Sequence, residues 1–440
     1  MLKKIFNFLL THYERIKKRH LQGNLTKGLF IVGSGIIIAQ IITVITTPII
    51  TRLYPPADFG VLAVFSSTLT IIVIAGGFRY DSALPLPKED TDAANLFVLF
   101  VLILSVSTII FIGVILLFGD FFFSLFHAED LQPYFFLLIV GFFGTGIYRA
   151  LTYWVTRRRD YVRITHTKIN QSVGGVVGKI ILGFLSFGPL GLIIGYILSQ
   201  CMGITTLLKK MWSKDRHLFR HISREKMMAM AKEYRQFPLY SFPAAIFNTI
   251  ATAAPAILLS SIYGFEVAGF FGLAYSMIGL PGSLISGSLA QVYYAEASHM
   301  IRENSPELLS LFKSTTKKLL LIGIPLIGIP SVIAPYIFPI IFGNVWRDAG
   351  YYCLPLTFTV IGGFVMSATT NLGGYGNNNW QLIFDFSRTM LVLGGFYLVT
   401  IFSLPVMTAL LLYSSLMAIM YFVIYFMNIA AIKRIRPDNT

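Results

Sequence analysis

Residues 93–118, AANLFVLFVLILSVSTIIFIGVILLF, decide the class of fold, because no charged side chain interrupts this apolar run. A transmembrane helix needs about 20 mostly apolar residues. Further stretches of this kind follow along the chain, at 28–51, 59–80, 132–155, 167–187, 189–209, 237–262, 267–292, 318–341, 349–371, 380–402 and 405–429. We therefore predict an all-α integral membrane protein with about 12 transmembrane helices.

The amino-acid composition also indicates a membrane protein, and it indicates where in the chain the function resides. Of the 440 residues, 55% are hydrophobic and 12% are charged, whereas soluble domains average about 25% charged residues. The longest polar stretch, 209–236, is too short to fold as a soluble domain, so the function must reside in the membrane part. The net charge of +15 is explained by cytoplasmic loops, and no nucleic-acid partner is expected.

Lysine and arginine also predict the orientation. With the N-terminus inside, inner segments hold 30 of the 35 basic residues, whereas outer segments hold only Arg52 and Arg347. The remaining three, Arg149, Lys179 and Arg388, fall within predicted spans. Because basic residues accumulate in cytoplasmic loops, both termini are expected in the cytoplasm.

The longest basic loop divides the chain near its middle. We expect an amphipathic segment on the cytoplasmic membrane surface at 1–27, an N-terminal lobe of six helices at 28–209 and a basic linker at 210–236. A C-terminal lobe of six helices at 237–429 and a cytoplasmic tail at 430–440 follow.

The two halves share a weak similarity at the start of their second helices. Residues 57–63 and 266–274 each contain an acid, then a glycine, then an apolar run, and each preceding helix has a late proline, Pro48 or Pro255. Chance is one explanation. The other is an internal repeat, with the substrate site between the lobes. Since each half has an even number of helices, the relating axis would run along the membrane normal.

Several short motifs are distinctive. They are Arg52-Leu53-Tyr54 with Ala57-Asp58-Phe59-Gly60, Arg79-Tyr80-Asp81, Trp154 with Arg157-Arg158-Arg159 leading to Gln171-Ser172, and Leu289-Ala290-Gln291-Val292-Tyr293-Tyr294. With these motifs the chain resembles the bacterial oligosaccharide flippases of the Wzx type. The resemblance implies the multidrug/oligosaccharidyl-lipid/polysaccharide exporter fold, in which two six-helix lobes form a V around a central cavity.

The resemblance also implies a function. Such a flippase moves an undecaprenyl-pyrophosphate-linked oligosaccharide from the cytoplasmic to the periplasmic leaflet of the bacterial inner membrane, by alternating access. The product would be a surface polysaccharide such as O-antigen, capsule or exopolysaccharide, and a polymerase and chain-length machinery are further expected partners. No enzyme, cofactor or metal site is predicted, because no nucleophile–base constellation, phosphate loop or metal-ligand cluster is recognisable.

Lys179 is the first candidate for binding such an anionic substrate. Ionisable residues within spans are costly and face the protein interior by default. Lys179 lies about 18 Å into its predicted helix at 1.5 Å per residue, close to the bilayer midplane. It shares a helix face with Gln171 and Gly175. That face borders either a cavity or a neighbouring helix, and the alternative is a lysine that extends to the interface.

Two arginines within spans are further candidates. Arg149 either extends to the inner interface or faces the cavity. Arg388 follows Asp385 by one helical turn, so it either forms a structural ion pair with it or binds pyrophosphate or uronic acids in the second lobe.

The remaining candidates lie at the helix ends. Arg79, Tyr80 and Asp81 are expected at the cytoplasmic mouth, as an interfacial anchor or as the first contact of a lipid-linked diphosphate. Arg52 on the outer side either pairs with Asp58 as a gate or caps its helix.

Gln291, near the end of the eighth predicted helix, is a further gating candidate. It belongs to one of the motifs that carry the flippase resemblance, and that resemblance is the reason for including it.

Two other transporters and one enzyme class remain as alternatives. A cation-coupled multidrug exporter of the same fold generally needs a carboxylate in the first lobe, often in its first helix, and residues 28–51 contain none. A lipid II flippase usually has two more C-terminal helices. A membrane glycosyltransferase or polymerase would need a carboxylate-rich site or a long periplasmic loop, and neither is visible in the sequence.

Overall fold

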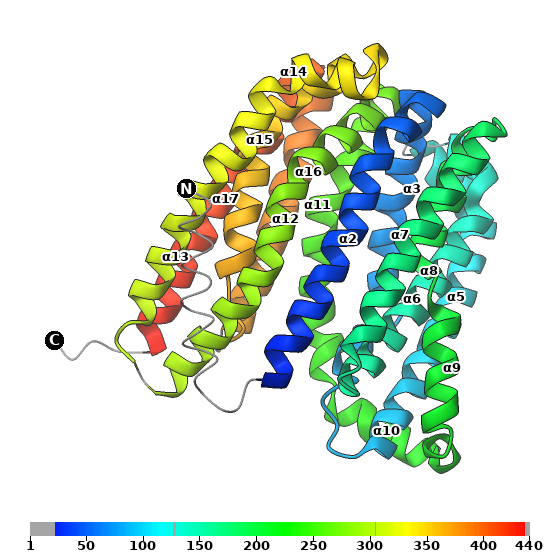
Figure 1. Cartoon of the computed structure of the whole chain (residues 1–440), viewed down its shortest axis with the longest axis vertical. Helices are drawn as coiled ribbons and strands as arrows, with labels where there is room; N and C mark the ends of the chain where they lie inside the picture. Colours follow the sequence, from blue (N-terminus) through cyan, green and yellow to red (C-terminus); the bar gives the residue numbers. More distant parts are fainter. Residues whose placement is uncertain (1–22, 126–128, 304, 376, 436–440) are drawn as a thin grey trace.

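The computed structural model describes residues 23–125, 129–303, 305–375 and 377–435, and within these ranges every regular element is a helix. The amphipathic helix expected near the N-terminus lies almost wholly outside the described residues, as does the end of the predicted tail. The structure thus has the predicted all-α architecture (Figure 1).

The first half of the chain contains six long helical spans and several short helices. The spans are α2 (Gly23–Leu53), α3 (Pro56–Ala75), α5 (Asp90–Leu125), α6 (Phe135–Arg157), α7 (Tyr161–Phe184) and α8 (Pro189–Cys201) continued by α9 (Ile204–Asp215). The short helices are α4 (Tyr80–Ala83), η1 (Glu129–Tyr134), η2 (Leu218–His221) and α10 (Arg224–Glu233). The helices η2 and α10 occupy most of the predicted basic linker.

The second half repeats this plan. Its spans are η3 (Phe237–Ser241) with α11 (Phe242–Tyr263), α12 (Phe265–Arg302), α13 (Leu308–Gly323) with η4 (Ile324–Gly328) and α14 (Ile329–Phe342), α15 (Arg347–Thr369), α16 (Asn378–Ile401) and α17 (Val406–Ile435). The short η5 (Asn344–Trp346) joins α14 to α15.

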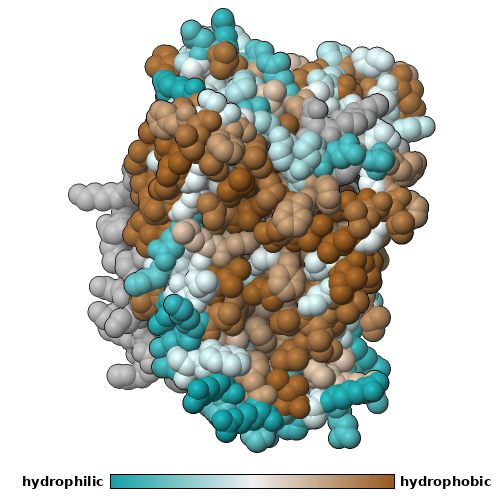
Figure 2. All heavy atoms as spheres, turned by 90° about the vertical axis from the view of Figure 1, so that its right-hand side faces the viewer, coloured by the Kyte–Doolittle hydropathy of each residue, from teal (hydrophilic) through white to brown (hydrophobic). Residues whose placement is uncertain are grey.

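Eleven helices in the described residues are long and apolar enough to cross a membrane. The twelfth long helix, α7, is more polar because it carries Arg163, Lys168 and Lys179. Figure 2 shows a broad hydrophobic belt between two hydrophilic ends on the face formed by the first half. The chain is therefore a multi-pass membrane protein.

Several helices are longer than predicted. The eighth predicted span ends at 292, whereas α12 continues to Arg302, and the ninth is predicted from 318, whereas α13 begins at Leu308. The length of an apolar run corresponds to the thickness of the hydrocarbon layer. A helix can continue past the end of that layer as long as its backbone remains hydrogen-bonded. Hydropathy therefore underestimates helices that project from the membrane.

The two halves meet along α3, which packs against both α11 and α12. A Cβ added to Gly60 would collide with the backbone carbonyl of Phe265, and a Cβ added to Gly269 would collide with that of Pro56. The contact is reciprocal, because each carbonyl belongs to the residue four positions before the other glycine. A two-fold relation between the two halves would produce this exchange, and only glycine permits backbones to approach so closely.

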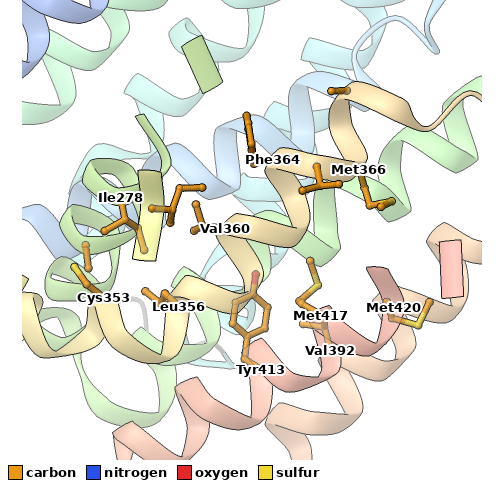
Figure 3. Close-up of a cluster of buried hydrophobic side chains, with 14 of the residues drawn as sticks. Ile278, Cys353, Leu356, Val360, Phe364, Met366, Val392, Tyr413, Met417 and Met420 are labelled. Atoms are coloured by element: carbon orange, nitrogen blue, oxygen red, sulfur yellow. The ribbon is translucent and has the colours of Figure 1, made fainter. Parts of the chain in front are cut away.

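Each half has its own hydrophobic core. In the second half the core lies between α15 and α17 with contributions from α12 and α16. Figure 3 shows Leu356, Val360, Tyr413 and Met417 gathered there. The first half buries a separate cluster around Phe65, Leu104 and Trp154. Most of the buried apolar residues of each six-helix lobe therefore pack within that lobe.

Candidate functional site

A cavity of about 700 Å³ lies between the two lobes. The first lobe contributes wall residues from α2, α3, α7 and α8, and the second lobe contributes wall residues from α11, α12 and α15. Most polar groups in the wall are hydroxyls. Among the residues that the structure describes, Lys179 is the only charged one that lines this cavity.

Lys179 is held in place by close packing of α7 on α8. A Cβ on Gly195 would collide with Cγ of Lys179. A Cβ on Gly175 would lie only 3.0 Å from the carbonyl oxygen of Gly195. Directly after α2, the Tyr54 hydroxyl donates a hydrogen bond to the Lys179 carbonyl oxygen at 2.7 Å. The stem of this lysine is thus confined between two helices, which directs its ammonium group toward the cavity.

The Lys179 ammonium has no hydrogen-bond or ion-pair partner among the described residues. An unpaired charge within a bilayer is costly, and such residues mark substrate or ion pathways. The helix face that Lys179 shares with Gln171 is divided: Gln171 donates to the Gln200 carbonyl of α8 at 2.7 Å, so this part of the face borders the neighbouring helix.

The structure separates the other predicted arginines from this cavity. Arg149 forms an ion pair with Asp81 at 2.8 Å inside the first lobe, and Asp81 is almost fully buried. Neither residue lines the cavity. The pair connects α6 to the short α4, so in this conformation the Arg149 charge is balanced by a carboxylate of its own lobe.

Arg79 and Tyr80 lie in a strained turn after α3. Phe78 and Arg79 both have left-handed backbone angles, with φ of 46° and 66°, which is uncommon for residues with side chains. The Arg79 Nε is buried without a hydrogen-bond partner, whereas the Tyr80 hydroxyl donates to the Ala231 carbonyl at 3.1 Å. Strain of this kind persists where the surroundings impose it and is common at functional sites.

Arg388 and Asp385 form the ion pair that their spacing permits, with a distance of 3.0 Å between Nη2 and Oδ1. Arg388 also donates to Oδ1 of Asn248 on α11 at 2.5 Å, and Gln381 donates to Asp385 at 2.8 Å. Both charged residues are buried within the second lobe and do not line the cavity. The cluster links α16 to α11.

Arg52 connects the two lobes by hydrogen bonds, at the end of the molecule opposite Arg79. It donates to the carbonyls of Pro48 and Ile341, both at 2.9 Å, and to that of Ile340 at 3.4 Å. The alternative in which Arg52 pairs with Asp58 is not realised, because free carbonyls at the ends of α2 and α14 attract the guanidinium.

Trp346 in η5 makes two further contacts between the lobes at the Arg52 end of the molecule. Trp346 donates its indole N–H to the Thr51 carbonyl at 3.0 Å, and its ring meets Phe59 edge-on at 4.8 Å. The remaining gating candidate, Gln291, belongs to α12, and its side chain lies outside the described part of the chain.

One charged network was not predicted from the sequence. Arg158 pairs with Asp90 at 2.6 Å and with Asp215 at 2.9 Å, and Arg157 pairs with the same Asp90 at 2.9 Å. Trp154 donates its indole N–H to Asp215 at 2.9 Å. The motif Trp154 with Arg157-Arg158 was visible in the sequence, but its acidic partners lie more than 50 positions away along the chain.

The sequence matches one described protein family and one characterised relative. Residues 49–350 match the sequence profile of a family described as "Polysaccharide biosynthesis protein". The chain is 21% identical over 309 residues to the "Succinoglycan biosynthesis transport protein ExoT" of Rhizobium meliloti (strain 1021). The match covers 69% of this chain and only 60% of that protein, so the chain spans about three fifths of its relative's length.

Solved structures show the same fold. A multidrug resistance MATE family transporter of the MOP superfamily, in an inward-facing conformation, superimposes with a TM-score of 0.71 at 16% identity, covering 94% of this chain and 96% of that one. Its outward-facing conformation gives 0.60 with the same coverage. A MOP superfamily transporter from Pyrococcus furiosus gives 0.59 at 16% identity, covering 93% and 96%.

Proposed function

Since the chain belongs to the polysaccharide biosynthesis protein family, we propose that it is a flippase for lipid-linked oligosaccharides in the bacterial inner membrane. Its cargo would be an undecaprenyl-pyrophosphate-linked repeat unit, carried from the cytoplasmic to the periplasmic leaflet for O-antigen, capsule or exopolysaccharide synthesis. A polymerase and chain-length machinery would receive it.

The observation that carries this proposal is the unpaired Lys179 in the wall of the cavity between the lobes. A diphosphate is an anion with acceptor oxygens only, and a charge-assisted hydrogen bond to a lysine contributes about 1.5–3 kcal/mol. Hydroxyl groups around the rest of the wall suit a polar glycan. An anionic head with a sugar chain therefore matches the charge and the polarity of this cavity.

Alternating access is supported by the unequal ends of the molecule. Arg52, Trp346 and the reciprocal glycines Gly60 and Gly269 join the lobes at one end. From there α2 and α12 diverge toward the end where α2 begins (Figure 1). The positive-inside bias assigns that diverging end to the cytoplasm. The cargo head would enter there, and transport would require the closed end to open.

A cation-coupled multidrug exporter of the same fold is not favoured by this cavity. Cationic drugs need a carboxylate, and the residues that line the cavity include none. The likeness to multidrug transporters, at 16% identity, concerns the fold alone.

The test deletes the gene and restores it with matched lysine variants. Lys179→Ala removes the cavity charge, whereas Lys317→Ala removes an exposed lysine of α13 that does not line the cavity. We expect the deletion to abolish one surface polysaccharide and to trap its lipid-linked intermediate in the inner leaflet. Wild type and Lys317→Ala should restore the polymer, and Lys179→Ala should restore less than about a tenth of it.

Two outcomes would contradict the proposal. If the polysaccharide persists after deletion, or if its intermediate reaches the outer leaflet normally, the chain is no flippase for that polymer. If Lys179→Ala restores the polymer as fully as Lys317→Ala, the cavity lysine does not bind the cargo.

A further inference from the structure

Seven of the hydroxyl groups that line the cavity have a common orientation. Each donates its hydrogen to a backbone carbonyl three or four residues earlier in its own helix, at 2.7–3.2 Å. These residues are Thr43, Thr47, Ser66, Thr252, Ser276, Ser283 and Ser367. A hydroxyl has one hydrogen to donate and two lone pairs to offer. Once the hydrogen is used, the oxygen presents only acceptor capacity to the cavity.

This orientation distinguishes between two parts of an anionic glycolipid. Phosphate oxygens only accept hydrogen bonds, so they gain nothing from a wall of acceptors unless a hydroxyl gives up its backbone bond. Sugar hydroxyls are donors and can bond to these oxygens directly. Lys179 provides the charged donor that the phosphate requires. These seven hydroxyls thus offer acceptors to a sugar chain, and the lysine offers a charged donor to the phosphate.

Hydroxyls of this kind line the cavity on both lobes, whereas the lysine belongs to the first lobe. Lys179 belongs to α7 of the first lobe, whereas Thr252, Ser276, Ser283 and Ser367 belong to α11, α12 and α15 of the second. Ser276 and Ser283 are separated by two helical turns, which is about 10 Å along α12. The second lobe therefore offers a row of acceptors opposite the cation, at a spacing that exceeds one sugar ring.

We propose that the second-lobe wall, centred on Ser276 and Ser283, is a glycan subsite that accepts hydrogen bonds from sugar hydroxyls while Lys179 holds the anionic group. This inference rests on the proposed flippase function and deepens it. The ligand class is a sugar chain with free hydroxyl groups. Derivatives without those hydroxyls lose the contact even when their size and charge are retained.

The experiment compares two defined glycolipids on purified protein in lipid nanodiscs. One probe is undecaprenyl diphosphate that carries a neutral galactose trisaccharide, and the other is the same lipid with every sugar hydroxyl methylated. Dissociation constants are measured by microscale thermophoresis for wild type, for Ser276→Ala with Ser283→Ala, and for Ser105→Ala. Ser105 donates to the Val101 carbonyl at 2.8 Å in the same way but lies on α5 away from the cavity.

Wild type and Ser105→Ala should bind the free glycan about tenfold more tightly than the methylated one, since each of the two neutral hydrogen bonds should contribute about threefold in affinity. In the double variant this preference should fall to about twofold. Its affinity for the methylated probe should be unchanged, which also shows that the variant is folded.

Three results would overturn the subsite. If wild type binds both probes equally, or if the double variant keeps the tenfold preference, the second-lobe hydroxyls do not recognise sugar, while the flippase function stands. If wild type binds neither diphosphate lipid, the proposed function fails and the subsite fails with it.

Discussion

The two lobes contain buried cations in opposite situations. Arg388 of the second lobe contacts Asp385 and Asn248 and is closed off from the cavity. Lys179 of the first lobe has no such partner and borders the cavity. A buried charge without a counterion destabilises the protein, whereas a paired one is close to neutral. The comparison indicates that Arg388 stabilises the structure. Lys179 lowers the stability of the protein, and ligand binding would explain its presence.

The largest expected effect follows from breaking the second-lobe pair. Arg388→Ala leaves the Asp385 carboxylate buried without a cation, which should lower the free energy of unfolding by about 3–5 kcal/mol. The matched variant combines Arg388→Met with Asp385→Leu and removes both charges, so it should recover most of that loss. Thermal unfolding of the purified protein in detergent measures the stability of both variants. If the single and the double variant are equally stable, the ion pair has no structural role.

A smaller effect should come from the contact between the lobes. Gly60→Ala or Gly269→Ala places a methyl group against a backbone carbonyl of the other lobe, at a cost of about 1–3 kcal/mol. Because the contact is reciprocal, both substitutions should shift the protein toward the state with the Arg52 end open. Labelling of a cysteine introduced beside Thr51 should report this opening. Gly113→Ala on α5, where a Cβ meets nothing within 4 Å, should leave the labelling unchanged.

The Lys179 substitution should act on stability in the opposite direction from Arg388→Ala. Lys179→Met keeps the side-chain length and removes an unpaired charge from the membrane, so unfolding should become harder by about 1 kcal/mol while transport is lost. The unfolding midpoint and a flipping assay on the same preparation test this. A destabilised Lys179→Met would mean that the lysine has a structural partner and that the contrast between the lobes is mistaken.

The smallest effect is expected at Arg52. Its hydrogen bonds reach exposed carbonyls at the helix ends, so Arg52→Ala should lower the free energy of unfolding by about 0.5 kcal/mol. Arg52→Lys should recover part of this, because a single ammonium cannot reach both helices as the guanidinium does. Opening of the Arg52 end, measured with the same cysteine label, should increase in the order wild type, Arg52→Lys, Arg52→Ala.

The comparison also shows which inferences a sequence supports. Intervals between charges revealed the Asp385–Arg388 pair, because residues one turn apart on a helix are neighbours wherever that helix lies. The partner of Arg52 was not recoverable in this way, since Ile341 is 289 positions away. Asp90 and Asp215, which hold Arg157 and Arg158, were overlooked for the same reason.

The sequence by itself determined the membrane class and the helical architecture, and it predicted a mid-membrane depth for Lys179. These depend on apolar length and on the cost of charge in hydrocarbon, which are properties of a local segment. Only the tertiary structure decided which cations are neutralised, which glycines join the lobes and which hydroxyls face the cavity. Those outcomes depend on how helices distant in the chain pack against one another, and neither hydropathy nor spacing along one helix contains that information.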